Sequence, residues 1–231
     1  MPIHWPHAAK YIQSRNEARE KARGTFLANH PEVLPLIALS GEYVAASALV
    51  LSGRDCRKLK HGLYISDLVV SFTRTHFIAQ ELLIQGEMIE AVVLLRKQLE
   101  LIARLHELVE EEDLRKLVRR TPNIRTLAPS IRRLYSLYSE VAHSSDPVHL
   151  QQLGRIEVGA KSYTPVYPVY DRNALVTFTH QVLMVIEYHH WSHPYMVASF
   201  PEYDAHAAEE LIGDLASHYL DAFVPFPREH G

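Results

Sequence analysis

The stretch MIEAVVLLRKQLELIARL, residues 88–105, decides the fold of this chain. Its apolar side chains surround almost the whole circumference of a helix, whereas a surface helix carries them on one stripe. A helix of this kind is covered by neighbouring elements on nearly every side. We therefore predict a helix from Glu87 to Glu112 that lies at the centre of a helical bundle.

The residues before this stretch predict an antiparallel partner helix. Leu68, Phe72 and Leu83 follow the spacing of one helical face, and Ser66-Asp67 supplies an N-cap. Gln85-Gly86 then ends the helix, because glycine adopts the left-handed conformation of a C-cap without strain. Two helices joined by so short a connection form a helical hairpin.

The remaining sequence predicts an all-α fold, a helical bundle of about seven helices with one small β-hairpin near residues 155–167. Further helices are expected at residues 7–28, 33–52, 130–143, 171–190 and 203–223, with a short helical turn from Asp146-Pro147. Ser40-Gly41 indicates a break in the second of these helices, and Trp191–Pro194 indicates an end to the one that Asp171 caps.

No stretch of the chain has the composition of a linker, so we predict a single helical domain over residues 1–231. Its N-terminal helices occupy residues 1–65, its core residues 66–170 and its C-terminal helices residues 171–231. With 47% hydrophobic and 22% charged residues, the composition is that of a globular protein and excludes global disorder.

Cysteine content and hydropathy point to a cytoplasmic protein. The single cysteine cannot form an internal disulfide, and Met1–Pro6 does not begin a signal peptide. Residues 33–51 are the one membrane-like window, but Pro35, Gly41 and Glu42 interrupt it, so we expect buried helices and no membrane. Because the net charge is −3, nucleic-acid binding needs a local basic patch.

The histidine content makes metal binding worth testing, since 15 of the 231 residues are histidine. The Glu-x-x-His spacing of di-iron bundles occurs twice, at residues 140–143 and 187–190. Such a site also needs a glutamate-bearing helix between the two motifs, and residues 146–170 carry only Glu157. Phosphate-binding glycine loops, dinucleotide fingerprints and zinc-protease motifs do not occur. We therefore predict no metal site and no cofactor.

Arg96 stands out within the apolar helix at residues 87–112. Burying a guanidinium among leucine and valine side chains costs several kcal/mol unless the charge is paired. Glu100 lies four residues on, on the same face, and the polar stripe that ends at His143 offers a third partner. We take Arg96, Glu100 and His143 as a candidate catalytic set, with the histidine as acid–base group. The alternative is a buried polar network that fixes the register of the helices.

A basic run follows the acidic cluster Glu110–Asp113. Seven basic residues and no acidic one lie between Leu114 and Ser139. Like charges four residues apart on a helix repel each other, and a phosphate backbone would relieve that repulsion. The candidate anion-binding residues are Arg119, Arg120, Arg132 and Arg133. The alternative is a solvated face whose charge the acidic cluster balances.

Two short motifs resemble those of a known group of proteins. LLRKQLE at residues 94–100 and LYSEVAHS at residues 137–144 are similar to the Arg-x-x-x-Glu and Ser-x-x-x-His motifs of uncharacterised bacterial helical-bundle proteins. The resemblance covers about residues 66–170. That group is similar in layout to HEPN (higher eukaryote and prokaryote nucleotide-binding) domains, many of which are dimeric, metal-independent ribonucleases of toxin and antiphage systems.

The resemblance implies an RNA partner, a homo-oligomer and a site at Arg96, Glu100 and His143. HEPN nucleases carry Arg and His on one helix, four to six residues apart, whereas here nine residues separate Arg133 from His143. The implied chemistry therefore requires Arg96 to meet His143 in space.

The leading expectation is an HEPN-like cytosolic helical protein that acts as a metal-independent ribonuclease or RNA-binding effector of a defence or toxin–antitoxin type. Two alternatives stay open on the sequence alone. One is a non-catalytic protein-interaction or dimerisation module, and the other is a metal-dependent helical oxygenase.

Overall fold

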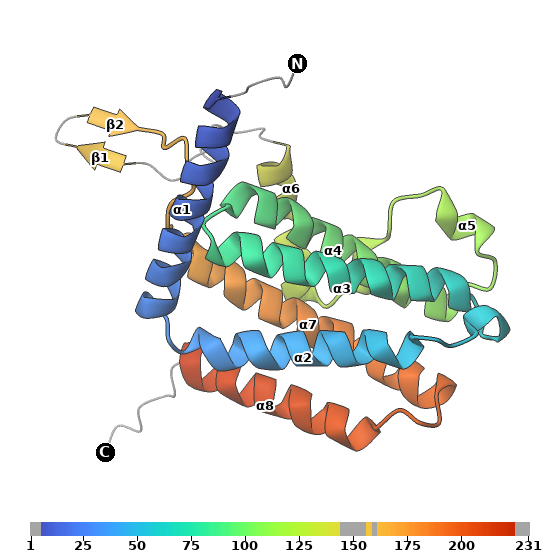
Figure 1. Ribbon diagram of the computed structural model, residues 1–231. Coiled ribbons are helices and arrows are strands. Elements are labelled where there is room, and N and C mark those ends of the chain that lie inside the picture. Colours follow the sequence, from blue (N-terminus) through green and yellow to red (C-terminus); the bar gives the residue numbers. More distant parts are fainter. Residues whose placement is uncertain (1–5, 144–155, 159–160, 225–231) are drawn as a thin grey trace.

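The chain folds around α4 (Met88–Glu110), which packs against α3, α6 and α7 (Figure 1). Leu95, Leu99 and Ile102 of this helix are completely buried, so the predicted central helix is confirmed. The computed structural model describes residues 6–143, 156–158 and 161–224. The helices are α1 (Pro6–Asn29), α2 (Val33–Leu51), α3 (Gly62–Ile84), α4 (Met88–Glu110), α5 (Arg115–Val118), α6 (Pro129–Ala142), α7 (Asn173–Ser199) and α8 (Ala205–Phe223), with 3-10 turns at Cys56–Lys58 and Ile124–Thr126.

The all-α fold class is confirmed. Within the described residues the bundle has eight helices rather than about seven, because the four-residue helix α5 adds to the predicted set. Strands β1 (Ile156–Val158) and β2 (Lys161–Tyr163) pair in antiparallel register at the predicted hairpin, which ends earlier than expected. The turn predicted at Asp146-Pro147 lies outside the described residues.

The helices lie in a simple spatial order (Figure 1). α3 and α4 form the predicted helical hairpin, and Gly86, with φ +80, lies in the turn that joins them. α2 lies beside α3 on one side and α8 on the other. α1 runs across one end of the bundle, next to the β-hairpin of β1 and β2. α6 runs back along α4, because Thr126 before α6 contacts the Ala103 carbonyl, whereas His143 after it contacts Arg96.

α2 continues through Ser40-Gly41, so the predicted break is wrong. Gly41 instead lets the Phe77 ring of α3 pack closely against α2, because a Cβ at this position would lie 3.2 Å from Cε1 of Phe77. By length and hydropathy α2 passes as a membrane span, with a mean hydropathy of 1.7 over its best window. A core helix passes the same test, and α2 packs against α3, α7 and α8, so one such helix is weak evidence for a membrane protein.

Two helix ends also differ from the prediction. α3 begins at Gly62, four residues before the predicted cap at Ser66, and His61 precedes it in the left-handed conformation with φ 55. α7 continues through Pro194 to Ser199. Proline removes one backbone hydrogen bond, but buried side chains on both sides of it, Trp191 and Met196, hold the helix in the core.

Candidate functional site

Arg96 and His143 meet in the structure, although 47 positions separate them in the sequence. Nη1 of Arg96 lies 3.4 Å from Nε2 of His143. Arg96 projects from α4, and His143 is the residue that follows α6. Because a guanidinium only donates hydrogen bonds, this contact requires an unprotonated Nε2 on the imidazole.

Tyr135 of α6 connects the three predicted site residues. Its hydroxyl donates to Oε1 of Glu100 at 3.0 Å and accepts from Nη2 of Arg96 at 3.3 Å. The Arg96 guanidinium also lies over the Tyr135 ring, 5.3 Å from its centre, as in a cation–π contact. The hydrogen bond to Tyr135, more than the charge of Glu100, raises the pKa of Arg96. Tyr135 was not among the predicted site residues, and its position eight residues before His143, about two helical turns, was the signal for it.

The Arg96–Glu100 pair is only partly buried, so the expectation of a fully buried pair is wrong. Nη2 of Arg96 lies 3.3 Å from Oε1 of Glu100, and the two side chains keep 24% and 30% of their exposure. His143 itself is exposed. Leu95 and Leu99 near Arg96 are buried, whereas Val93 is exposed. The Arg96 guanidinium contacts Tyr135 of α6 and His143, the residue after α6. An exposed imidazole beside a fixed cation is accessible to a ligand.

The buried ion pair of α4 lies two turns further on. Nη1 of Arg104 lies 2.8 Å from Oε2 of Glu107, and their side chains are 4% and 5% exposed. Glu107 also accepts from Nη2 of Arg120 at 2.9 Å and from the backbone of Asn123 at 3.2 Å. Arg104 in turn donates to the carbonyl of Arg120. These contacts attach the loop after α5 to the centre of the bundle.

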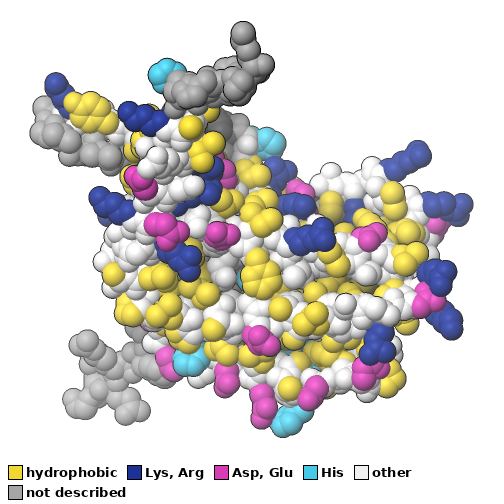
Figure 2. Space-filling view, in the orientation of Figure 1, with side chains coloured by type: hydrophobic (Ala, Val, Ile, Leu, Met, Phe, Trp, Pro, Cys, Tyr) yellow, Lys and Arg dark blue, Asp and Glu magenta, His cyan; other side chains and the backbone are white. Residues whose placement is uncertain are grey.

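The four candidate anion-binding arginines do not gather at His143. They are exposed, but Arg133 precedes His143 by ten residues, or about 15 Å along α6. Arg120 is bound to Arg104, which lies eight residues, or about 12 Å, beyond Arg96 on α4. Arg119 adjoins Arg120, and Arg132 adjoins Arg133. Figure 2 shows Lys and Arg side chains gathered at the end of the molecule where α5 lies.

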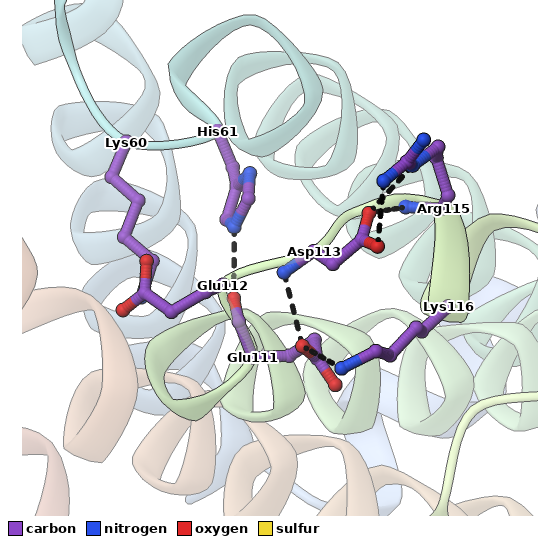
Figure 3. Close-up of polar contacts among 7 residues, drawn as sticks. All are labelled: Lys60, His61, Glu111, Glu112, Asp113, Arg115 and Lys116. Carbon is purple, nitrogen blue, oxygen red and sulfur yellow. Dashed lines mark hydrogen bonds and ion pairs between the residues drawn. The ribbon is translucent and has the colours of Figure 1, made fainter.

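Acidic residues neutralise the start of the basic run (Figure 3). Asp113 accepts from Nε of Arg115 at 2.9 Å, and Oε1 of Glu111 accepts from Nζ of Lys116 at 3.2 Å. These contacts lower the pKa values of both carboxyl groups, Asp113 through Arg115 and Glu111 first through the Asp113 backbone. The alternative of a solvated, charge-balanced face is therefore confirmed for these two basic residues.

The same loop is tied to the start of α3. Nζ of Lys60 lies 2.8 Å from Glu112, and Nε2 of His61 lies 2.9 Å from the carbonyl of Glu111 (Figure 3). The polar contacts in this region join two loops of the fold to each other.

The Glu187–His190 motif lies where α7 supports the start of α6. Among the residues that the structure describes, no group of three or more His, Cys, Asp or Glu side chains is placed to hold a metal ion. Glu187 is buried and accepts from the backbone N–H of Ala128 at 3.0 Å, directly before α6. His190 and His106 lie 3.6 and 3.8 Å from its carboxylate. Glu187 thus satisfies a backbone donor at the start of α6.

Comparisons with family models, with curated proteins and with solved structures found no match to this chain.

Proposed function

We propose that this chain is an HEPN-like cytoplasmic effector that cleaves RNA without a metal ion, with His143 and Arg96 as its catalytic pair. The observation that carries the proposal is the 3.4 Å approach of Arg96 Nη1 to an exposed His143. The two motifs that resemble the bacterial helical proteins contribute one of these residues each. In those HEPN domains that act as nucleases, the same two residue types carry the chemistry.

The reaction that suits this pair is internal transesterification of RNA. The single lone pair of His143 Nε2 accepts from Arg96 in the free protein, so the bound phosphate has to draw the guanidinium away from it. Nε2 then takes the proton of a ribose 2′-hydroxyl while that oxygen attacks the adjacent phosphorus. The bond to the 5′-oxygen breaks, and this oxygen takes a proton from solvent, which leaves a 2′,3′-cyclic phosphate and a 5′-hydroxyl. Arg96 stabilises the charge that grows on the phosphate. Glu100 and Tyr135 hold the guanidinium in place.

A homodimer belongs to the proposal, as in the domains that the chain resembles. Two copies would present two Arg96–His143 pairs to one RNA. The exposed arginines of the basic run, Arg119, Arg132 and Arg133, would contact the phosphate backbone at a distance from the reacting bond.

The test is cleavage of a mixed RNA pool in EDTA. We expect His143→Ala to reduce the rate about 100-fold or more, as loss of a general base does, and Arg96→Ala to do the same. His206→Ala is the matched control, because His206 is an exposed histidine of α8 that pairs only with Glu210 among the described residues.

Two outcomes would overturn this function. One is no cleavage by the wild-type protein anywhere from about pH 6 to 8, the range in which histidine ordinarily titrates. The other is cleavage that His143→Ala leaves unchanged. Either result would favour the interaction module, for which the links between α4 and α6 through Tyr135 are structural supports.

A further inference from the structure

A hollow of about 240 Å³ lies between α2 and α8, away from the Arg96–His143 pair. Its walls are small and apolar, with Ala46 and Val50 on α2 and Ala207, Ala208 and Leu211 on α8. Figure 1 shows these two helices side by side along the bundle. Small side chains on both helices leave the space between them open.

Hydroxyl groups form the polar end of this hollow. Tyr43, Ser47 and Tyr203 line it. The Tyr43 hydroxyl lies 2.9 Å from Oγ of Ser192 and 2.8 Å from Nδ1 of His189. Tyr43 is only 1% exposed and also has a side-chain hydrogen bond with Tyr203, so its hydroxyl is satisfied within the protein.

Burial keeps this polar end uncharged. Desolvation lowers the pKa of His189 to about 4 and raises the pKa values of Tyr43 and Tyr203. Tyr188 lies against Tyr43, is completely buried, and has a hydroxyl without a hydrogen-bond partner in the described structure. At neutral pH the histidine and the tyrosines therefore bring no charge to the hollow.

The charges that do line the hollow are negative. Glu42 and Asp204 both lie at it, and its described lining includes no Lys or Arg. The two tyrosines add rings whose faces attract cations. Carboxylates and tyrosine rings favour a positively charged ligand, while the alanine walls favour a short apolar chain.

We propose that the hollow between α2 and α8 binds a small organic ammonium ion with a short aliphatic chain. The ammonium group lies between the carboxylates of Glu42 and Asp204, and the chain lies against Ala46, Ala207 and Ala208. This site is separate from the proposed ribonuclease site and does not depend on it.

The test is a titration of the full chain with n-butylammonium, followed by protein NMR chemical shifts. Sodium butyrate and 1-butanol are the comparison ligands, because they keep the chain and change only the charge. We expect n-butylammonium to bind at least fivefold more tightly than either one. We also expect its shifts to be confined to residues of α2, α8 and Tyr203.

Charge-removing variants locate the site. Glu42→Gln combined with Asp204→Asn should weaken binding about fivefold or more, the effect expected of two exposed charges. Both residues are exposed, and Asn keeps the side-chain cap that Asp204 gives to Ala207, so the variant should fold. Glu210→Gln removes one exposed charge of α8 outside the hollow and should leave binding unchanged.

Three results would overturn the proposal. The first is the absence of any shift with n-butylammonium at about 20 mM. The second is that butyrate or butanol binds as tightly as n-butylammonium. The third is that Glu210→Gln weakens binding as much as the double variant does. A second variant, Ala208→Leu, fills the hollow without a change of charge and should abolish the shifts. Binding that survives in a folded Ala208→Leu protein would also place the ligand elsewhere.

Discussion

Arg104 and Glu107 form the buried ion pair of the central helix, with 2.8 Å between Nη1 and Oε2. Removing one partner leaves the other charge buried without compensation, which costs about 3–5 kcal/mol. We therefore expect Glu107→Ala to lower the free energy of unfolding by about that amount. Urea denaturation measures it, and a change below about 1 kcal/mol would show that Arg104 is not confined as the structure has it.

Glu100→Ala is the contrasting change on the same helix. The Arg96–Glu100 pair keeps 24% and 30% of its side-chain exposure, and pairs that retain contact with solvent contribute about 0–1 kcal/mol. We expect Glu100→Ala to destabilise the protein by no more than about 1 kcal/mol in the same denaturation series. A loss as large as that of Glu107→Ala would place this pair in the core.

Tyr135→Phe removes one hydroxyl and keeps the ring beneath Arg96. The variant loses the hydrogen bonds to Glu100 and Arg96, so we expect it to destabilise the protein by about 1 kcal/mol. Tyr135→Ala also loses the ring and should cost more. If the proposed function holds, Tyr135→Phe should reduce RNA cleavage less than His143→Ala does. Equal rates for Tyr135→Phe and the wild type would exclude a positioning role for the hydroxyl.

His76 makes the stability depend on pH. It is completely buried in α3, and desolvation lowers its pKa from 6.5 to about 4. The folded state therefore binds fewer protons than the unfolded state between these two values. The contribution of a neutral His76 is complete above about pH 6.5 and is lost as the pH falls towards 4, which amounts to about 2 kcal/mol at pH 5.

The measurement is urea denaturation of the wild type and His76→Leu at pH 7 and pH 5. We expect the wild type to lose more stability than His76→Leu over this interval, because leucine has no proton to bind. Gln181 donates to the backbone carbonyl of His76 at 2.9 Å, and the substitution leaves that contact available. Equal losses in the two proteins would show that His76 does not remain neutral in the folded state.

Gly62 and Gly213 should respond in opposite directions to alanine. A Cβ at Gly62 would lie within 2.0 Å of the Cys56 carbonyl oxygen, so the turn before α3 has to move. Gly213 lies inside α8, and a Cβ there would meet nothing within 4 Å. We expect Gly62→Ala to lower the melting temperature. Gly213→Ala should raise stability by about 0.5–1 kcal/mol through helix propensity.

Local patterns in the sequence determined the helices and the position of the central one. The apolar circumference of residues 88–105 predicts burial because most of that helix's surface is apolar, and Gly86 predicts the turn because it adopts positive φ without strain. Both signals act within a few residues of the chain. Both signals can therefore be recognised in the sequence without knowledge of the rest of the fold.

Only the tertiary structure decided which charges are buried and which side chains meet. Arg96 and Arg104 have similar neighbours in the sequence, yet the loop after α5 covers Arg104, while α6 leaves Arg96 partly exposed. Pro194 stays helical for the same kind of reason, since core packing outweighs one lost hydrogen bond. The approach of Arg96 to His143 depends on how α6 crosses α4. Such long-range packing is set by the sum of many contacts, which no local pattern records.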